Sequence, residues 1–125
     1  MLVLGVRTQA VRGWRVLLAA AVAVQLVVLY APDAGGGSIM PGQDKVVHAL
    51  VFALVVWTGL RAGVPAVPLV ALSLLHAPVS EIVQARVFDG RTGDVADAAA
   101  DVAGVLAALA VVGLARRRRR GIMGS

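Results

Sequence analysis

Apolar residues are grouped along the chain into four long stretches, and short polar segments separate them. The stretches cover residues 16–30, 46–60, 64–88 and 95–115. A soluble helix needs a polar face, whereas a helix in lipid does not. The pattern therefore predicts an all-α fold: a small polytopic membrane protein built as a four-transmembrane-helix bundle.

Polar and turn-forming residues predict where these helices begin and end. We expect the first helix to extend back through Trp14 and to end near Tyr30, since both residue types favour membrane interfaces. Asp44 and Asp94 stand where the N-caps of the second and fourth helices are expected. Glycine, proline and serine between residues 32 and 43 predict a loop. The second apolar stretch is short for a bilayer, so its helix must start within the headgroup region or distort the membrane.

The first apolar stretch follows basic residues, which is also typical of a secretory signal peptide. No small-x-small cleavage site follows cleanly at residues 31–34, so a transmembrane helix is the favoured interpretation.

Small residues indicate where helices approach closely. Gly59-x-x-x-Gly63 has the spacing of a helix-packing motif, but it overlaps a basic turn, and turn geometry is the favoured cause. Gly104 and Ala108 are better placed for a close helix contact.

Composition agrees with a membrane protein of a single domain, residues 1–125. Hydrophobic residues make up 59% of the chain and charged residues 15%, against about 45–50% and about 25% in soluble domains. The chain has no cysteine, which excludes disulfides, thiolate zinc sites and a cysteine nucleophile. The sequence gives no reason to expect a cofactor.

The net charge of +5 is unevenly distributed. Arginines lie near the N-terminus, at Arg61 and in the basic tail, residues 116–125, where five follow one another. The arginines flank apolar stretches, and no aromatic residue interleaves with the C-terminal run, so they indicate membrane topology rather than nucleic-acid binding. The rule that basic flanks stay inside predicts a multi-pass cell-membrane protein with both termini in the cytoplasm. The loops at residues 31–45 and 85–93 are then extracytoplasmic.

With this topology, the residues able to do chemistry gather at the extracytoplasmic side. We predict that they form a water-accessible binding pocket. Asp101 lies about two turns inside the fourth helix, where a carboxylate facing lipid is costly, so it should face the bundle. The predicted binding residues are Asp44, Lys45, His48, Ser80, Glu81, Gln84, Arg91, Asp94, Asp97 and Asp101.

Two of these residues are candidates for catalysis. Glu81 has the chemistry of a general base, and His48 that of a proton carrier or metal ligand. Both also have structural interpretations: His48 as a partner of Asp44 or Glu81, and Glu81 as a partner of Lys45 or of Arg91. The aspartate spacing lacks the loop of a known calcium motif, so we predict no metal site there.

The order of these residues resembles the VanZ-like family. The motifs are Asp44-Lys45-x-x-His48-x-x-x-Phe52, Ser80-Glu81-x-x-Gln84 and Arg91-x-x-Asp94-x-x-Asp97-x-x-x-Asp101-x-x-Gly104. The resemblance covers residues 44–104. Many relatives have asparagine where this chain has Asp101. The resemblance implies a cell-envelope membrane protein associated with low-level resistance to the glycopeptide teicoplanin.

Three kinds of function fit this sequence. The first is a non-enzymatic envelope protein whose outer pocket binds a lipid-linked envelope precursor or a glycopeptide. The second is an enzyme that acts on a lipid-linked substrate. The third is a proton- or ion-coupled carrier that uses the region of Asp101, Glu81 and His48. In each case the expected partners include membrane lipids and exclude nucleic acid, and the oligomeric state is open.

Overall fold

The computed structural model describes residues 2–32, 39–89 and 93–123. These residues form four α-helices and no strand. The helices are α1 (Leu2–Tyr30), α2 (Gln43–Arg61), α3 (Ala66–Val87) and α4 (Val95–Met123). The prediction of an all-α, four-helix architecture is therefore confirmed.

All four helices are long and apolar enough to cross a membrane. A bilayer core of about 30 Å needs about 20 helical residues. The candidate spans are Thr8–Tyr30, Gln43–Arg61, Ala66–Val87 and Val95–Met123. The span of α2 begins at Gln43, ahead of its apolar stretch, so its polar first turn supplies length that the apolar residues lack. The chain is thus a multi-pass membrane protein.

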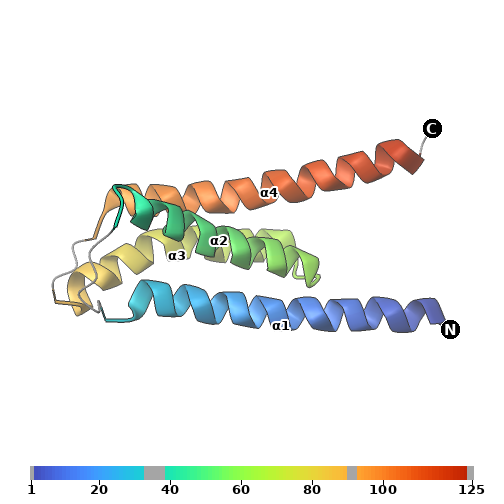
Figure 1. The fold of residues 1–125 in the computed structure, drawn as a ribbon, viewed down its shortest axis with the longest axis horizontal. Helices are drawn as coiled ribbons and strands as arrows, with labels where there is room; N and C mark the ends of the chain where they lie inside the picture. The colour runs from blue at the N-terminus through green and yellow to red at the C-terminus, as the bar shows by residue number, and fades with distance from the viewer. Residues whose placement is uncertain (1, 33–38, 90–92, 124–125) are drawn as a thin grey trace.

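The helices run alternately up and down in one bundle. Figure 1 shows α1 and α4 on opposite sides with α2 and α3 between them. α2 packs most extensively against α4 and then against α1. Among the described residues, α1 and α4 do not contact each other. We call the end where α1 and α3 finish the site end, and the end that holds both termini the arginine end (Figure 1).

The bundle core is small and surrounded by exposed apolar side chains. Phe52, Val56 and Val105 are fully buried between the helices. On α3, by contrast, Val67 is 81% exposed and Leu72 is 66% exposed. Such outward apolar faces are stable in contact with lipid chains, as expected for membrane spans.

Of the two predicted helix N-caps, the one at Asp94 is present in the structure and the one at Asp44 is not. Asp94 precedes α4, and its Oδ1 accepts the backbone N–H of Ala96 at 2.8 Å, so the predicted N-cap is confirmed. The predicted cap at Asp44 is wrong. Gly42, with a left-handed φ of 77°, occupies the N-cap position of α2, and Asp44 lies inside the first turn. Asp44 is instead hydrogen-bonded to Lys45 at 3.3 Å.

Glycines permit close packing between helices at two places along the bundle, and a third glycine forms a turn. A Cβ on Gly104 would collide with the backbone of Ala49, so α4 and α2 approach closely there, as predicted. The Gly59–Gly63 pair serves two purposes. Gly63 has a φ of +84° in the turn, whereas a Cβ on Gly59 would lie 2.7 Å from the Leu69 side chain on α3. Turn geometry therefore explains Gly63, and helix packing explains Gly59.

Aromatic residues join α1 to α2 towards the arginine end. The rings of Trp14 and Trp57 make an edge contact with their centroids 5.2 Å apart. The Arg61 guanidinium carbon lies 4.7 Å from the centroid of a Trp14 ring, within the range of a cation–π interaction. These contacts hold α1 against α2, the helices that carry Arg12, Arg15 and Arg61.

Candidate functional site

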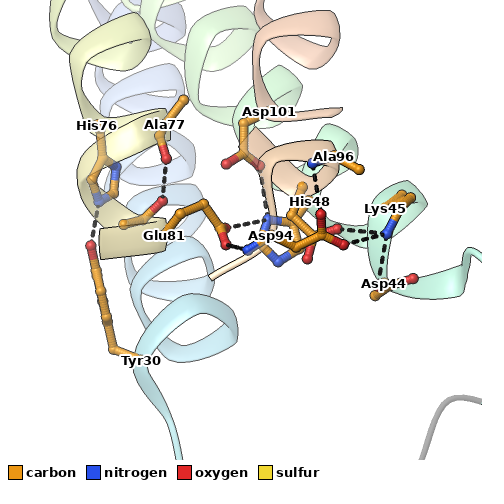
Figure 2. Close-up of polar contacts among 12 residues, drawn as sticks. Tyr30, Asp44, Lys45, His48, His76, Ala77, Glu81, Asp94, Ala96 and Asp101 are labelled. Carbon is orange, nitrogen blue, oxygen red and sulfur yellow. Dashed lines mark hydrogen bonds and ion pairs between the residues drawn. The ribbon is translucent and has the colours of Figure 1, made fainter. Parts of the chain in front are cut away.

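A lysine at the start of α2 holds the start of α4. Lys45 Nζ lies 3.1 Å from an oxygen of Asp94 and 3.1 Å from an oxygen of Asp97, in addition to its contact with Asp44 (Figure 2). The Lys45 and Asp94 side chains are partly exposed, while that of Asp97 is 13% exposed. This ion-pair network fixes the register of α2 against α4 at the site end.

A second contact between α2 and α4 lies deeper in the bundle. His48 Nδ1 is 3.0 Å from Asp101 Oδ1 and 3.7 Å from Glu81 Oε1 (Figure 2). Asp101 is fully buried, so it faces the bundle as predicted. The expected partner of His48 was Asp44 or Glu81, and of these two the structure pairs it with Glu81, at the longer distance. The observed close partner is Asp101, because the imidazole points towards α4 whereas Asp44 bonds Lys45.

Glu81 connects α3 to the start of α4. Its Oε2 accepts the backbone N–H of Asp94 at 2.9 Å. The predicted pairing of Glu81 with Lys45 is wrong, because Lys45 is bound by the aspartates. A Cβ on Gly93 would lie 2.7 Å from the backbone oxygen of Glu81, so glycine permits this close approach. Arg91, the other predicted partner and a predicted binding residue, lies outside the described residues.

Ser80 and Gln84 are buried on the inner face of α3, but they differ in their bonding. Ser80 Oγ donates to the backbone oxygen of Ala77 on its own helix at 2.8 Å, an arrangement that does not activate it as a nucleophile. Gln84 is 5% exposed, and its Nε2 has no hydrogen-bond partner. The Ser80 hydroxyl is therefore used within its own helix, whereas the Gln84 amide presents a hydrogen-bond donor to the interior of the bundle.

Among the residues that the structure describes, three buried polar atoms of the site have no hydrogen-bond partner. They are Glu81 Oε1, Gln84 Nε2 and Asp101 Oδ2. A buried polar group without a partner costs about 1–3 kcal/mol, and more if it is charged. Such groups are rare in folded proteins, and they call for a ligand, an ion or ordered water.

A groove runs between α3 and α4 beside this site. It has a volume of about 390 Å³. Its polar lining includes Glu81, Asp94 and Arg86, and its apolar lining includes Ile82 and Ala98. Arg86 was not among the predicted site residues, because nothing in its local sequence separates it from a solvated surface charge.

A hydrogen bond between α1 and α3 was also not anticipated. Tyr30 Oη and His76 Nε2 lie 2.8 Å apart (Figure 2). The Tyr30 ring also stacks on Phe88, with centroids 6.4 Å apart, and the Phe52 and His76 rings lie 5.5 Å apart. Tyr30 thus helps to join α1 to the site end. No local motif could have revealed this pair, because 46 residues separate its members.

Asp94 lies just outside the membrane spans, and its environment favours the charged form. The backbone N–H of Ala96 and the ammonium of Lys45 hold the pKa of this carboxyl below its usual value. A lowered pKa means that the carboxylate stabilises the fold above the pKa of the unfolded chain. That contribution is lost as the pH falls through the folded-state pKa.

Comparisons with known proteins found no relative of this chain. No family model matches it, and neither does any curated protein or solved structure.

Proposed function

We propose that this chain is a VanZ-like cell-envelope protein that binds the headgroup of a lipid-linked envelope ligand at its site end. The observation that carries the proposal is the position of the unpartnered buried groups. Glu81, whose Oε1 is unpartnered, also lines the groove between α3 and α4. A ligand lying in that groove would contact Glu81, the residue that carries this buried oxygen.

The lining of the groove indicates the chemistry of the ligand. Carboxylate oxygens accept hydrogen bonds, so Glu81 and Asp94 suit the hydroxyls of a sugar or an amine. Ile82 and Ala98 offer apolar contact to a hydrocarbon chain. Arg86 adds a cation in the same groove, which suits the phosphate that links many headgroups to their lipids.

The proposal places the site end outside the cell. The described acidic residues all lie at or near the site end, whereas Arg61 and the run at residues 116–120 lie towards the arginine end. Basic flanks remain in the cytoplasm during insertion. With an even number of crossings, both termini are then cytoplasmic and the groove faces the outer leaflet.

Cysteine labelling tests this orientation. The chain has no native cysteine. Ile39 at the site end is 89% exposed and Met123 at the arginine end is 82% exposed. We expect Ile39→Cys to react with a membrane-impermeant maleimide in intact cells, and Met123→Cys to react only after permeabilisation. The reverse pattern would place the groove in the inner leaflet and overturn the proposal.

Glu81→Gln tests ligand binding. The amide oxygen of glutamine can still accept the Asp94 N–H, but the charge is lost, and a charged hydrogen bond contributes about 1.5–3 kcal/mol. We therefore expect about tenfold less lipid bound to the purified protein by native mass spectrometry. Expression of the wild-type chain should also raise the inhibitory concentration of teicoplanin in a susceptible bacterium, and Glu81→Gln should not.

Asp89→Asn is the matched control for Glu81→Gln. Asp89 is an exposed carboxylate at the same end of the bundle, and it does not line the groove. Its variant should retain the lipid and the teicoplanin phenotype of the wild-type chain. Equal lipid binding by the wild-type chain and Glu81→Gln, at equal membrane abundance, would refute a headgroup site at Glu81.

One observation favours an enzyme as the second candidate. The 3.0 Å contact between His48 and Asp101 has the geometry of an imidazole base oriented by a carboxylate. An enzyme would release an altered lipid. Incubation of the purified protein with radiolabelled envelope lipids, followed by thin-layer chromatography, separates turnover from binding alone.

A further inference from the structure

We infer that the site end binds a divalent transition-metal ion between His48, Glu81 and Asp97. One potential ligand atom from each of these residues lies within 4.8 Å of the other two. The three residues come from α2, α3 and α4. A bound ion would therefore join three helices at one point.

The unpartnered oxygens supply an independent reason for a cation. Glu81 is 7% exposed, and its Oε1 has no hydrogen-bond partner in the described part of the chain, although it lies 3.7 Å from the imidazole of His48. Asp101 is fully buried, and its Oδ2 is likewise unpartnered. Two buried carboxylates thus have lone pairs directed into the protein, and a cation satisfies such groups.

The charge balance points in the same direction. Glu81, Asp94, Asp97 and Asp101 surround the site. Within residues 2–32, 39–89 and 93–123, Lys45 is the permanent cation that contacts them, through Asp94 and Asp97. Uncompensated carboxylates are costly within a membrane-spanning bundle. A dication would offset two of these charges without any change in the helices.

The ligand types select the kind of ion. Imidazole nitrogen suits zinc and other first-row transition metals, and carboxylate oxygen is accepted by zinc and manganese. Calcium prefers six to eight oxygen ligands, and a site with an imidazole does not suit it. Zinc binds nitrogen and oxygen at about 2.0–2.2 Å, so side-chain rotation must draw the ligand atoms somewhat closer together.

Asp101 is placed as a positioning residue for the imidazole. Its Oδ1 lies 3.0 Å from His48 Nδ1. A carboxylate that holds a ligating histidine in this way fixes the orientation of the ring and raises the basicity of the ligand. The cluster thus contains both the ligands of a metal site and a group that orients one of them.

The inference shares Glu81 with the proposed lipid site, but it does not require a lipid, because the other two metal ligands, His48 and Asp97, do not line the groove. It is tested with the full-length chain purified in detergent without a histidine tag. The protein is stripped with EDTA, loaded with ZnCl₂ or MnCl₂, desalted and analysed for metal content. We expect one zinc or manganese ion per chain, and no displacement by equal calcium or magnesium.

Variants determine whether the metal occupies this cluster. Glu81→Gln and Asp97→Asn should each lower the zinc affinity measured by isothermal titration calorimetry by at least about tenfold, because changing even a residue that only supports a metal ligand costs about 10–100-fold. Asp89→Asn should bind as the wild-type chain does. If Glu81→Gln loses the circular dichroism of its helices, the zinc affinity of Asp97→Asn becomes the test of the site. This variant is expected to fold, because Asp97 is only partly buried and asparagine can still accept a hydrogen bond from Lys45.

Two results would overturn the inference. One is a wild-type chain that retains less than about a tenth of an equivalent of either metal. The other is equal affinity in the wild-type chain and Asp97→Asn, which marks adventitious binding. In either case the lipid adduct seen by native mass spectrometry is unaffected, so failure of the metal site is distinct from failure of the proposed function.

Discussion

Gly104→Ala is expected to destabilise the bundle by about 1–3 kcal/mol or more, the range for overpacked sites. A Cβ at this position would lie 2.8 Å from the carbonyl carbon of Ala49, and backbone cannot rotate away as a flexible side chain can. The strain is relieved only if α2 and α4 move apart. The free energy of unfolding in mixed micelles, from titration with sodium dodecyl sulfate, measures the loss.

Gly113→Ala is the matched control on the same helix. No heavy atom lies within 4 Å of a Cβ built at Gly113. Alanine is also the better helix former by about 0.5–1 kcal/mol, so this variant should be as stable as the wild-type chain or slightly more so. If both glycine variants lose the same stability, the contact between α2 and α4 does not depend on Gly104.

The Gly104 variant should also impair the site. The contacts of Lys45 with Asp97 and of His48 with Asp101 both span α2 and α4, and Asp101 is one helical turn from Gly104. Separation of the two helices lengthens both contacts. We therefore expect Gly104→Ala to reduce zinc binding and lipid binding, and Gly113→Ala to leave both unchanged.

His48→Ala is expected to cost about 3–5 kcal/mol, the range for removing one partner of a buried ion pair. Asp101 is fully buried, and His48 is its observed hydrogen-bond partner, 3.0 Å away. Without the imidazole, its carboxylate is left inside the bundle with no compensation. The same unfolding titration at pH 7 measures this loss.

Asp101→Asn removes the charge but retains an acceptor for the imidazole. The exchange leaves no uncompensated carboxylate, so we expect a loss of less than about 1 kcal/mol, comparable to one neutral hydrogen bond. The variant also tests whether the acid contributes anything besides stability. Equal destabilisation by His48→Ala and Asp101→Asn would contradict the interpretation of this pair.

The arrangement of the site depends on the position of α2 along α4. α2 contacts each of the other helices, and it carries both Lys45 and His48. These two residues meet acids from α4 at successive depths, first Asp94 and Asp97 and then Asp101. A shift of α2 along α4 by one helical turn would break both contacts together, so packing at Gly104 and polar pairing support the same register.

The sequence by itself determined the number of helices and the place of Asp101. Four apolar stretches without polar faces are stable as helices in lipid, and the structure has helices over each of them. Hydrocarbon penalises a carboxylate, so Asp101 was expected to face the bundle, and it is fully buried. Both deductions rest on the cost of transfer into lipid, which depends on residue type and depth alone.

Only the tertiary structure decided which side chains pair. Lys45 binds Asp94 and Asp97, Glu81 accepts a backbone N–H, and Tyr30 reaches His76. Gly42 rather than Asp44 occupies the N-cap position of α2, because the helix begins before its apolar stretch. These outcomes depend on the rotation and axial offset of each helix. A rotation of one residue, about 100°, turns a side chain from one neighbour to another, and only the packing of the helices against each other fixes that angle.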